Sequence, residues 1–383
     1  MIKKTFLAWH QLTHVKTRLI VAIMGITFAD ILMFMQLGFK DALFDSSVIL
    51  HKHLNGDLFL INSQSNSLVA MKNFSRQYLY KSLSINDVAT ASPVYLEFGF
   101  WRNPFNYNSR AILVLGINPQ YDTFYFPGLA EKIDILKMPD VILFDQNSRI
   151  EYGAIADKLN QGQKVTAELR GRKVKVGGLF SLGASFSSDG HVLTSDINFV
   201  RIFKRDINSI EIGVIKIKSE GDLLATQRAI SQFLPKNVVV LTKEEFMDFE
   251  KKYWQESTSI GFIFFLGTAM GFIVGIVIVY QILYTDVTDH LPEYATLKAM
   301  GYKDVYFLNL ILQEAIILAL LGYLPGLAIS AYLYSLTASA TSLPLFISTT
   351  KATTVFICTV IMCCVSGAIA MNKLRSADPA ECF

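Results

Sequence analysis

Four long apolar stretches constrain this chain more than any other feature, because each is long enough to cross a lipid bilayer as a helix. Such a helix needs about 20 residues to cross about 30 Å of hydrocarbon. The stretches are residues 19–39, 260–283, 306–336 and 353–371. The whole composition agrees, since 52% of the residues are hydrophobic and only 17% are charged. The sequence therefore predicts a membrane protein with four spans.

The first span could be mistaken for a cleavable signal, because basic residues precede it. A signal has a shorter apolar region that ends in small residues, whereas this stretch continues through Ile31–Met35, so we expect an uncleaved anchor. The positive-inside rule then places both termini in the cytoplasm. The basic residues that decide this are Lys3, Lys4, Lys16 and Arg18 before the first span, and Lys373 and Arg375 after the last.

These spans divide the chain into nine expected segments. A cytoplasmic interfacial helix, with Ile2, Phe6, Trp9 and Leu12 at helical spacing, is expected first. The segments, in order, are the interfacial helix 1–18, transmembrane helix 1 at 19–43, a periplasmic α+β domain at 44–257, transmembrane helix 2 at 258–284, a cytoplasmic coupling segment at 285–304, transmembrane helix 3 at 305–336, a short periplasmic loop at 337–352, transmembrane helix 4 at 353–372, and a cytoplasmic tail at 373–383. The predicted fold is an α-helical four-span bundle with a large α+β extracytoplasmic domain between spans 1 and 2.

Short β-rich runs alternate with helical ones in the large domain. Residues 95–188 are rich in Gly, Asn, Pro and aromatic side chains, so we expect them to form a subdomain inserted into the first. The expected strands are residues 57–61, 111–117, 141–144, 173–180, 212–217 and 238–241, and the expected helices are 67–83, 195–203, 222–233 and 243–254.

The sequence gives no basis for catalysis, a cofactor or nucleotide binding. No G-x-x-x-x-G-K-[ST] phosphate loop occurs, and the hydrolase pattern G-x-S-x-G is broken at Ser187. The net charge of +3 and the scattered basic residues do not form the footprint of a nucleic-acid-binding protein. The histidine pairs His10/His14 and His51/His53 could share a metal in principle, but a solvated polar surface is the simpler interpretation.

A short charged segment between spans 2 and 3 has the features of a compact helix. Pro292 suits a first helical turn, Asp289 could accept backbone N–H bonds before it, and Gly301 could supply the left-handed end. Tyr294, Leu297 and Lys298 fall near one another at helical spacing and could offer an apolar, charge-flanked contact to a cytoplasmic partner. From spacing alone, an ordinary amphipathic linker is equally compatible with this segment.

This segment resembles a known motif. Residues 293–301, from Glu293 through Met300 to Gly301, resemble the coupling helix of FtsX/MacB-type ABC permeases, and practically the whole chain is similar to the DevC family of ABC exporter permeases. The stretches that carry the DevC resemblance are residues 28–34, 36–39, 260–264, 279–284, 289–291 and 377–380.

The resemblance implies a type VII ABC system in the cell inner membrane. Such a system pairs two copies of a four-span permease with two copies of an ATPase. In this family a periplasmic membrane-fusion adaptor leads to a TolC-like outer-membrane channel. Because this chain carries no nucleotide-binding motif, the ATPase would be a separate chain. The coupling residues implied are Glu293, Tyr294, Leu297, Lys298, Met300 and Gly301, and the resemblance suggests a glycolipid or another amphiphile as cargo.

Polar groups inside the spans have two interpretations. A charge in hydrocarbon is costly unless it faces protein or water, so Asp30 and Glu314 are expected at helix interfaces, although proton coupling is the alternative. Gln36, Gln281 and Gln313 are expected to form hydrogen bonds between helices rather than to line a cargo path. Gly267, Gly271 and Gly275 recur every four residues and predict close packing, either between helices of one chain or at a dimer interface.

Three classes of function remain open at this point. The leading hypothesis is a permease that transmits movement from the ATPase to the outer domain. The alternative is an FtsX-like regulator, which would transmit ATPase motion to a periplasmic hydrolase. A membrane sensor is less well supported, because only about 20 residues lie between spans 2 and 3 and leave no room for an output domain.

Overall fold

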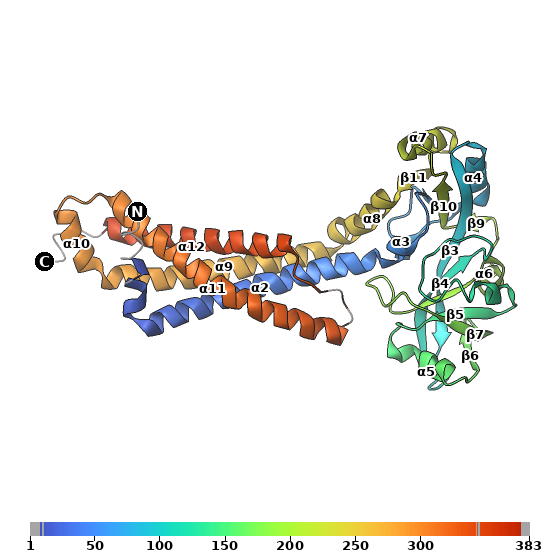
Figure 1. Cartoon of the computed structure of the whole chain (residues 1–383), viewed down its shortest axis with the longest axis horizontal. Coiled ribbons are helices and arrows are strands. Elements are labelled where there is room, and N and C mark those ends of the chain that lie inside the picture. Colours follow the sequence, from blue (N-terminus) through green and yellow to red (C-terminus); the bar gives the residue numbers. More distant parts are fainter. Residues whose placement is uncertain (1–7, 10, 342, 344, 377–383) are drawn as a thin grey trace. The chain divides into compact units, whose positions relative to one another are not determined.

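The computed structural model describes residues 8–9, 11–341, 343 and 345–376, with side chains given to residue 371. Ile2, Lys3, Lys4, Phe6 and His10, the tail at 377–383, and the side chains of Lys373 and Arg375 lie outside the described part. The chain divides into two compact units, Leu43–Thr258 and the combination of Met1–Ala42 with Ser259–Phe383. We call the first the α/β domain and the second the membrane bundle (Figure 1).

In the described part of the chain, four helices are long and apolar enough to span a membrane, which confirms the four-span prediction. They lie alongside one another in the membrane bundle (Figure 1). Their bounds are α2 Lys16–Ser47, α9 Ser259–Asp289, α11 Asp304–Thr341 and α12 Thr349–Ser376. Each extends a few residues beyond the apolar stretch that predicted it, because helical geometry continues past the hydrocarbon into polar flanks. Residues 8–9 and 11–14, before α2, are also helical.

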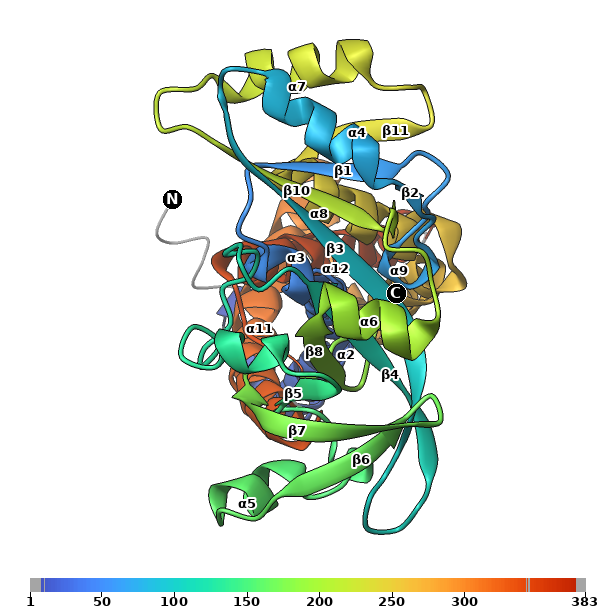
Figure 2. The same ribbon diagram turned by 90° about the vertical axis from the view of Figure 1, so that its right-hand side faces the viewer.

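The α/β domain is built on a nine-stranded mixed sheet, in the order β11-β1-β10-β3-β4-β8-β5-β7-β6 (Figure 2). The pairs β4–β8 and β5–β7 are parallel, and the remaining ladders are antiparallel. The strands are β1 Leu58–Asn62, β3 Val88–Arg102, β4 Ser109–Ile117, β5 Val141–Asp145, β6 Val165–Leu169, β7 Arg172–Phe180, β8 His191–Ser195, β10 Ile212–Ile217 and β11 Val238–Thr242, and β2 Phe74–Ser75 pairs separately with β9 Ser209–Ile210.

Helices cover both faces of this sheet, and each face has its own apolar core. Leu79, Phe199 and Ile230 bring α4, α6 and α7 onto one face. Leu50 and Phe246 bring α3 and α8 onto the other. The helices of the domain are α3 Ile49–His53, α4 Arg76–Lys81, α5 Ile155–Asn160, α6 Asp196–Phe203, α7 Leu223–Phe233 and α8 Lys243–Lys252, with short turns η1 Leu68–Ala70, η2 Ser82–Ser84, η3 Ile133–Lys137, η4 Ile150–Tyr152 and η5 Tyr253–Ser257.

The sequence located six of these strands but missed β3, the longest one. β3 pairs with β10 at its start and with β4 and β6 further along, so it joins the first part of the domain to residues 95–188. Those residues therefore continue the same sheet, in which β6 also pairs back to β3, and the bounds of the expected inserted subdomain stay a prediction. Pro93 lies within β3, and a proline inside a run argues against a central strand, so the pattern was not recognised.

The predicted helix at residues 67–83 is confirmed only in its second half. Its first part is the turn η1 followed by the short strand β2, and only α4 and η2 are helical afterwards. Two contacts distant in sequence decide this. Asn62 Nδ2 donates to the Asn73 carbonyl oxygen at 2.7 Å, and Phe74 pairs with Ile210. Tertiary contacts therefore override the local helical spacing in this segment.

Candidate functional site

The segment between spans 2 and 3 folds into the nine-residue helix α10, Leu291–Ala299. Pro292 lies in its first turn, as predicted. Gly301 has a φ angle of 95°, and its N–H donates to the Lys298 carbonyl oxygen while the Tyr302 N–H donates to that of Leu297. This pair of bonds is the Schellman ending that a glycine favours. The helix therefore begins and ends where the punctuating residues indicated.

The start of α10 differs from the prediction in one respect. Asp289 does not cap the helix; the residue before α10 is His290, and it makes no side-chain capping bond. Asp289 instead accepts a hydrogen bond from the Arg18 guanidinium, which also pairs with Asp286 at 3.1 Å. Arg18 lies at the start of α2, so these ion pairs tie the cytoplasmic segment to the first span. Apart from the charges at the ends of the spans, no sequence feature indicated this contact.

Tyr294 does not offer a contact to a partner, because its side chain is only 1% exposed. Its ring packs against Phe307 of α11 with centroids 5.4 Å apart, inside a cluster that includes Leu310 and Met371. Burial raises the pKa of the Tyr294 hydroxyl above its usual range, so that group stays protonated. We therefore correct the expectation for Tyr294: it fastens α10 to the bundle instead of facing the cytoplasm.

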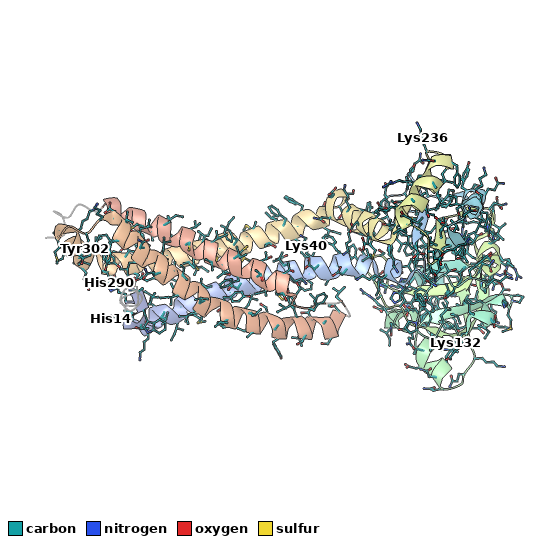
Figure 3. The ribbon with its side chains drawn as sticks, turned by 45° about the horizontal axis from the view of Figure 1, so that its top comes forward. His14, Lys40, Lys132, Lys236, His290 and Tyr302 are labelled. Atoms are coloured by element: carbon teal, nitrogen blue, oxygen red, sulfur yellow. The ribbon has the colours of Figure 1, made fainter. Side chains whose placement is uncertain are left out.

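The remaining predicted coupling residues divide by exposure. Leu297 and Lys298 are half-buried, and Lys298 Nζ lies 3.4 Å from Asp304 Oδ1 at the start of α11. Glu293, Met300 and Gly301 are exposed, and Met300 is the most exposed of the large apolar side chains here at 70%. Tyr302, which the prediction did not include, is also exposed, and it lies with His290 at one end of the bundle (Figure 3). We call Glu293, Thr296, Met300 and Tyr302 the α10 surface.

The two acidic residues within the spans lie inside the bundle, as expected. Asp30 Oδ1 accepts a hydrogen bond from Thr359 Oγ1 of α12 at 2.6 Å. Neither carboxylate oxygen of Glu314 has a hydrogen-bond partner among the described residues. Gln281 was expected to bond between helices, but its side chain is exposed on the outer surface of α9. Helical spacing alone could not decide which side of α9 faces its neighbours.

The glycines of α9 face the other helices of the same chain. A Cβ atom on Gly267 would lie 2.5 Å from Gln36 Cδ of α2, and one on Gly275 would overlap Met362 of α12. A Cβ on Gly271 would lie 3.3 to 3.6 Å from atoms of Leu32 and Met33, a tight approach without overlap. Of the two interpretations left open, this arrangement supports helix packing within one chain.

A second close approach of helices was missed by the sequence analysis. Gly322, Gly326 and Ser330 recur every four residues on α11 and are all buried. A Cβ on Gly322 would lie 2.5 Å from Ile26 Cβ, and Thr27 Oγ1 donates to the Gly322 carbonyl oxygen at 3.0 Å. The four-residue spacing of small side chains was a signal that could have predicted this crossing of α2 and α11.

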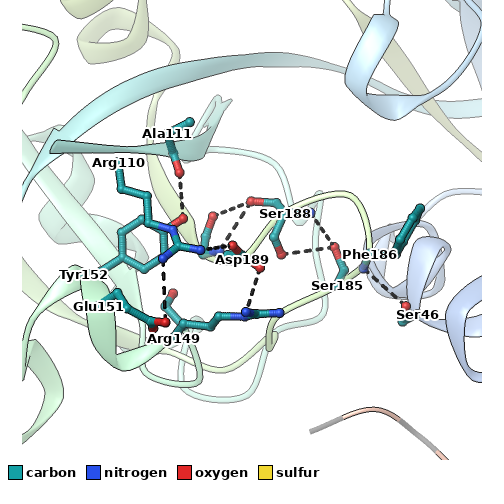
Figure 4. A network of polar contacts seen from close by, with 12 residues as sticks. Ser46, Arg110, Ala111, Arg149, Glu151, Tyr152, Ser185, Phe186, Ser188 and Asp189 are labelled. Carbon is teal, nitrogen blue, oxygen red and sulfur yellow. Dashed lines mark hydrogen bonds and ion pairs between the residues drawn. The ribbon is translucent and has the colours of Figure 1, made fainter. Parts of the chain in front are cut away.

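The α/β domain begins and ends with segments that are continuous with spans, and a loop at residues 181–190 contacts both. Figure 4 shows its contact with Ser46 and the ion pairs of Asp189 at its other end. The Phe186 N–H donates to Ser46 Oγ at 3.2 Å, and the Phe186 ring lies edge-on to Trp254 at 4.6 Å. At the other end of the loop, Asp189 pairs with Arg110 and, at 2.9 Å, with Arg149. The loop thus connects both terminal segments of the domain to its sheet.

Two histidines of the α/β domain, His51 and His191, are buried in its core. His191 Nδ1 lies 3.2 Å from the buried Asp145 carboxylate, which also accepts backbone N–H bonds from Leu182 and Gly183. His51 is buried, so the expected polar surface at His51 and His53 is wrong for the first of them. Within the described part of the chain, no three His, Cys, Asp or Glu side chains are grouped as a metal ion would need.

Comparison with known proteins found a matching family and similar solved structures. Residues 254–379 match the family described as FtsX-like permease C-terminal. Among solved structures, the periplasmic region of MacB from Actinobacillus actinomycetemcomitans matches with 12% identity over 50% of this chain and 91% of that chain, at a TM-score of 0.36. The extracellular domain of the noncanonic ABC-type transporter YknZ from Gram-positive bacteria matches with 14% identity over 49% of this chain and 99% of that chain, at a TM-score of 0.33. No curated protein matched. The family match supports the expected FtsX-like character of residues 254–379.

Proposed function

We propose that this chain is the permease subunit of an ATP-driven ABC exporter, and that a separate ATPase binds the α10 surface. The observation that carries the proposal is the way α10 is held. Its exposed side bears Glu293, Thr296 and Met300, while its opposite side is fixed to α11 through Tyr294 and Phe307. The match of residues 254–379 to FtsX-like permeases supports the same conclusion.

In this proposal α10 acts as a rigid connection between the ATPase and the spans. A displacement of α10 moves α11 through the Tyr294 cluster and through the ion pair of Lys298 with Asp304. The end of α9, which leads directly into α10, is tied to α2 through the ion pairs of Arg18 with Asp286 and Asp289, so the same displacement would also reach α2. α2 and α9 are continuous in sequence with the two ends of the α/β domain. Movement of the spans would then reach that domain without any chemistry in this chain.

The finer assembly belongs to the same proposal. We infer a homodimeric permease of the DevC type in an inner membrane, with both termini cytoplasmic and the α/β domain periplasmic. The partners would be two ATPase chains, a membrane-fusion adaptor and, through it, a TolC-like outer-membrane channel, and the cargo would be a glycolipid or another amphiphile. The positions of the basic residues around the first and last spans support the orientation.

The proposal is tested by placing a charge on the α10 surface. Met300→Glu should reduce co-purification of the ATPase at least tenfold, because a desolvated charge in an apolar contact costs more than about 1.4 kcal/mol. The ATPase is recognised in the purified complex by mass spectrometry, from its own phosphate-loop sequence. Leu224→Glu is the matched control, since Leu224 is a similarly exposed apolar side chain on α7 of the α/β domain.

Equal recovery of the ATPase with both variants would contradict the proposed contact. The same purification separates export from regulation. An adaptor protein in the complex supports an exporter, whereas a cell-wall hydrolase in place of an adaptor would favour the FtsX-like alternative.

A further inference from the structure

The two ends of the α/β domain are held together by a contact between α3 and α8. α3 follows α2 directly, and α8 leads through η5 into α9. α3 packs against α8 on one face of the sheet. Lys243 Nζ, at the start of α8, donates to the carbonyl oxygens of Lys52 and Leu54, each at 2.9 Å. Opening this contact would separate the segments by which the domain is joined to its two spans.

A buried pair of titratable side chains lies within this contact. His51 of α3 and Glu250 of α8 are 1% and 0% exposed, and His51 Nε2 lies 4.0 Å from Glu250 Oε2. The His51 ring packs edge-on against Phe246 with centroids 4.3 Å apart. Neither ring nitrogen of His51 has a hydrogen-bond partner among the described residues. Packing therefore places the His51 ring, without a hydrogen-bond partner, beside the Glu250 carboxyl group. A pair of apolar side chains at these positions would cost less free energy to bury.

The surroundings of Glu250 favour His51 as the group that shares its proton. Glu250 Oε2 accepts the Leu68 backbone N–H at 2.6 Å, and Oε1 accepts the Trp254 indole N–H at 2.8 Å. Both oxygens are thus already accepting, and His51 Nε2 is the basic nitrogen beside them. Burial raises the pKa of Glu250 to about 7 and lowers that of His51 to about 3. The pKa directions are opposite to those of an ion pair, so the close approach is not a salt bridge.

We propose that His51 and Glu250 form a one-proton latch, in which the α3–α8 contact is tightest when the two side chains together hold one proton. With no proton, the site buries a lone carboxylate. With two protons, it buries a lone imidazolium. Either state places an uncompensated charge in the core and favours opening. The latch depends on residues of the α/β domain alone, so it does not rest on the proposed ATPase partner.

The pH dependence follows from proton linkage. Glu250 has a pKa of about 7 in the closed contact and 4.5 when exposed, so between these values the closed form binds more protons and weakens as the pH rises. His51 has a pKa of about 3 when closed and 6.5 when exposed, so between these values the open form binds more protons and the closed form weakens as the pH falls. The two effects oppose each other between pH 4.5 and 6.5.

Other charged groups near this contact do not replace the pair. Lys251 of α8 is paired with Asp45 at 3.0 Å, and Asp57, just before β1, accepts the Ile217 backbone N–H. His53 Nδ1 lies 2.9 Å from the Ile49 carbonyl oxygen of its own helix. Besides the pair, the charged and titratable side chains of α3 and α8 are Lys52, His53, Lys243, Glu244, Glu245, Asp248, Lys251 and Lys252, and Asp45 and Asp57 lie in the neighbouring segments.

The latch is tested by amide hydrogen exchange on the full-length protein in detergent, between pH 4 and 8 and corrected for the intrinsic exchange rate. The probes are peptides that cover residues 49–54, 66–70 and 243–252. The wild-type opening constant should be nearly flat from pH 4.5 to 6.5. In the Glu250→Gln variant, protection of these peptides should rise by up to about tenfold per pH unit as the pH rises to 6.5. Only the loss of a proton from His51 in the open form then changes the equilibrium. His51→Phe should lose protection by up to about tenfold per pH unit towards pH 7.

Lys243→Met is the matched control, because it weakens the same contact without removing either partner of the pair. Its profile should run parallel to the wild-type profile at lower protection. Four parallel profiles would overturn the latch. If Glu250→Gln does not fold, the ¹⁵N signals of the His51 ring in the wild type decide the question. A neutral ring down to pH 5 is expected, and a ring that titrates near pH 6.5 would overturn the proposal.

Discussion

Tyr294→Ala is expected to uncouple ATP hydrolysis from the permease, although Tyr294 does not face the partner. The substitution removes a buried ring that packs against Phe307 and leaves a cavity between α10 and α11. Truncation of a buried aromatic side chain costs about 3–5 kcal/mol. This loss of packing energy weakens the attachment of α10, a short helix that few side chains hold against the bundle. The measurement is stimulation of the ATPase by the reconstituted permease, together with thermal unfolding in detergent.

Tyr294→Phe is the control for this prediction. Among the described residues, the hydroxyl accepts one long hydrogen bond, from Gln11 Nε2 at 3.5 Å, so its removal should change stability little. The phenyl ring keeps the packing against α11. If alanine and phenylalanine variants stimulate the ATPase equally well, packing of α10 on α11 does not transmit movement.

Gly322→Ala is expected to destabilise the membrane bundle more than the same change at Gly271. A new Cβ on Gly322 would lie 2.5 Å from both Cβ and Cγ2 of Ile26, and the Ile26 Cβ cannot move without the backbone of α2. Overpacking of this kind costs about 1–3 kcal/mol. The Thr27 hydrogen bond to the Gly322 carbonyl oxygen would be strained as well. Unfolding of each variant in mixed micelles with increasing SDS measures the difference.

The comparison with Gly271→Ala isolates the steric part of this effect. Both glycines lie within long helices, so alanine gains the same helical propensity, about 1 kcal/mol, at either site. At Gly271 the new methyl group would meet its neighbours at 3.3 Å or more. Equal changes in unfolding midpoint for the two variants would show that α2 and α11 do not approach as closely as described.

Sequence features that act locally predicted the structure well. Hydrocarbon thickness fixes a minimum length for a span, so the apolar stretches located α2, α9, α11 and α12. Pro292 and Gly301 located α10, because these residues limit a helix through their own backbone geometry.

Features that depend on distant partners were not predicted. The buried side of α10 is decided by Phe307, and the contact of Arg18 with Asp286 joins residues 268 positions apart. His51 was interpreted, together with His53, as part of a solvated polar surface, and helical spacing gave no reason to expect its burial. The His51 side chain is buried because α8 packs against α3, a contact between segments far apart in the sequence. Spacing within one helix could not supply any of these three results.

The central claim is that a separate ATPase contacts the exposed side of α10, and site-specific photo-cross-linking tests it most directly. A photoreactive amino acid is placed at Met300 in one variant and at Leu224 in another, and both are irradiated in native membranes. We predict that Met300 cross-links to a chain with a nucleotide-binding phosphate loop and that Leu224 does not. Cross-linking of that chain at Leu224 alone, or at neither position, would contradict the account.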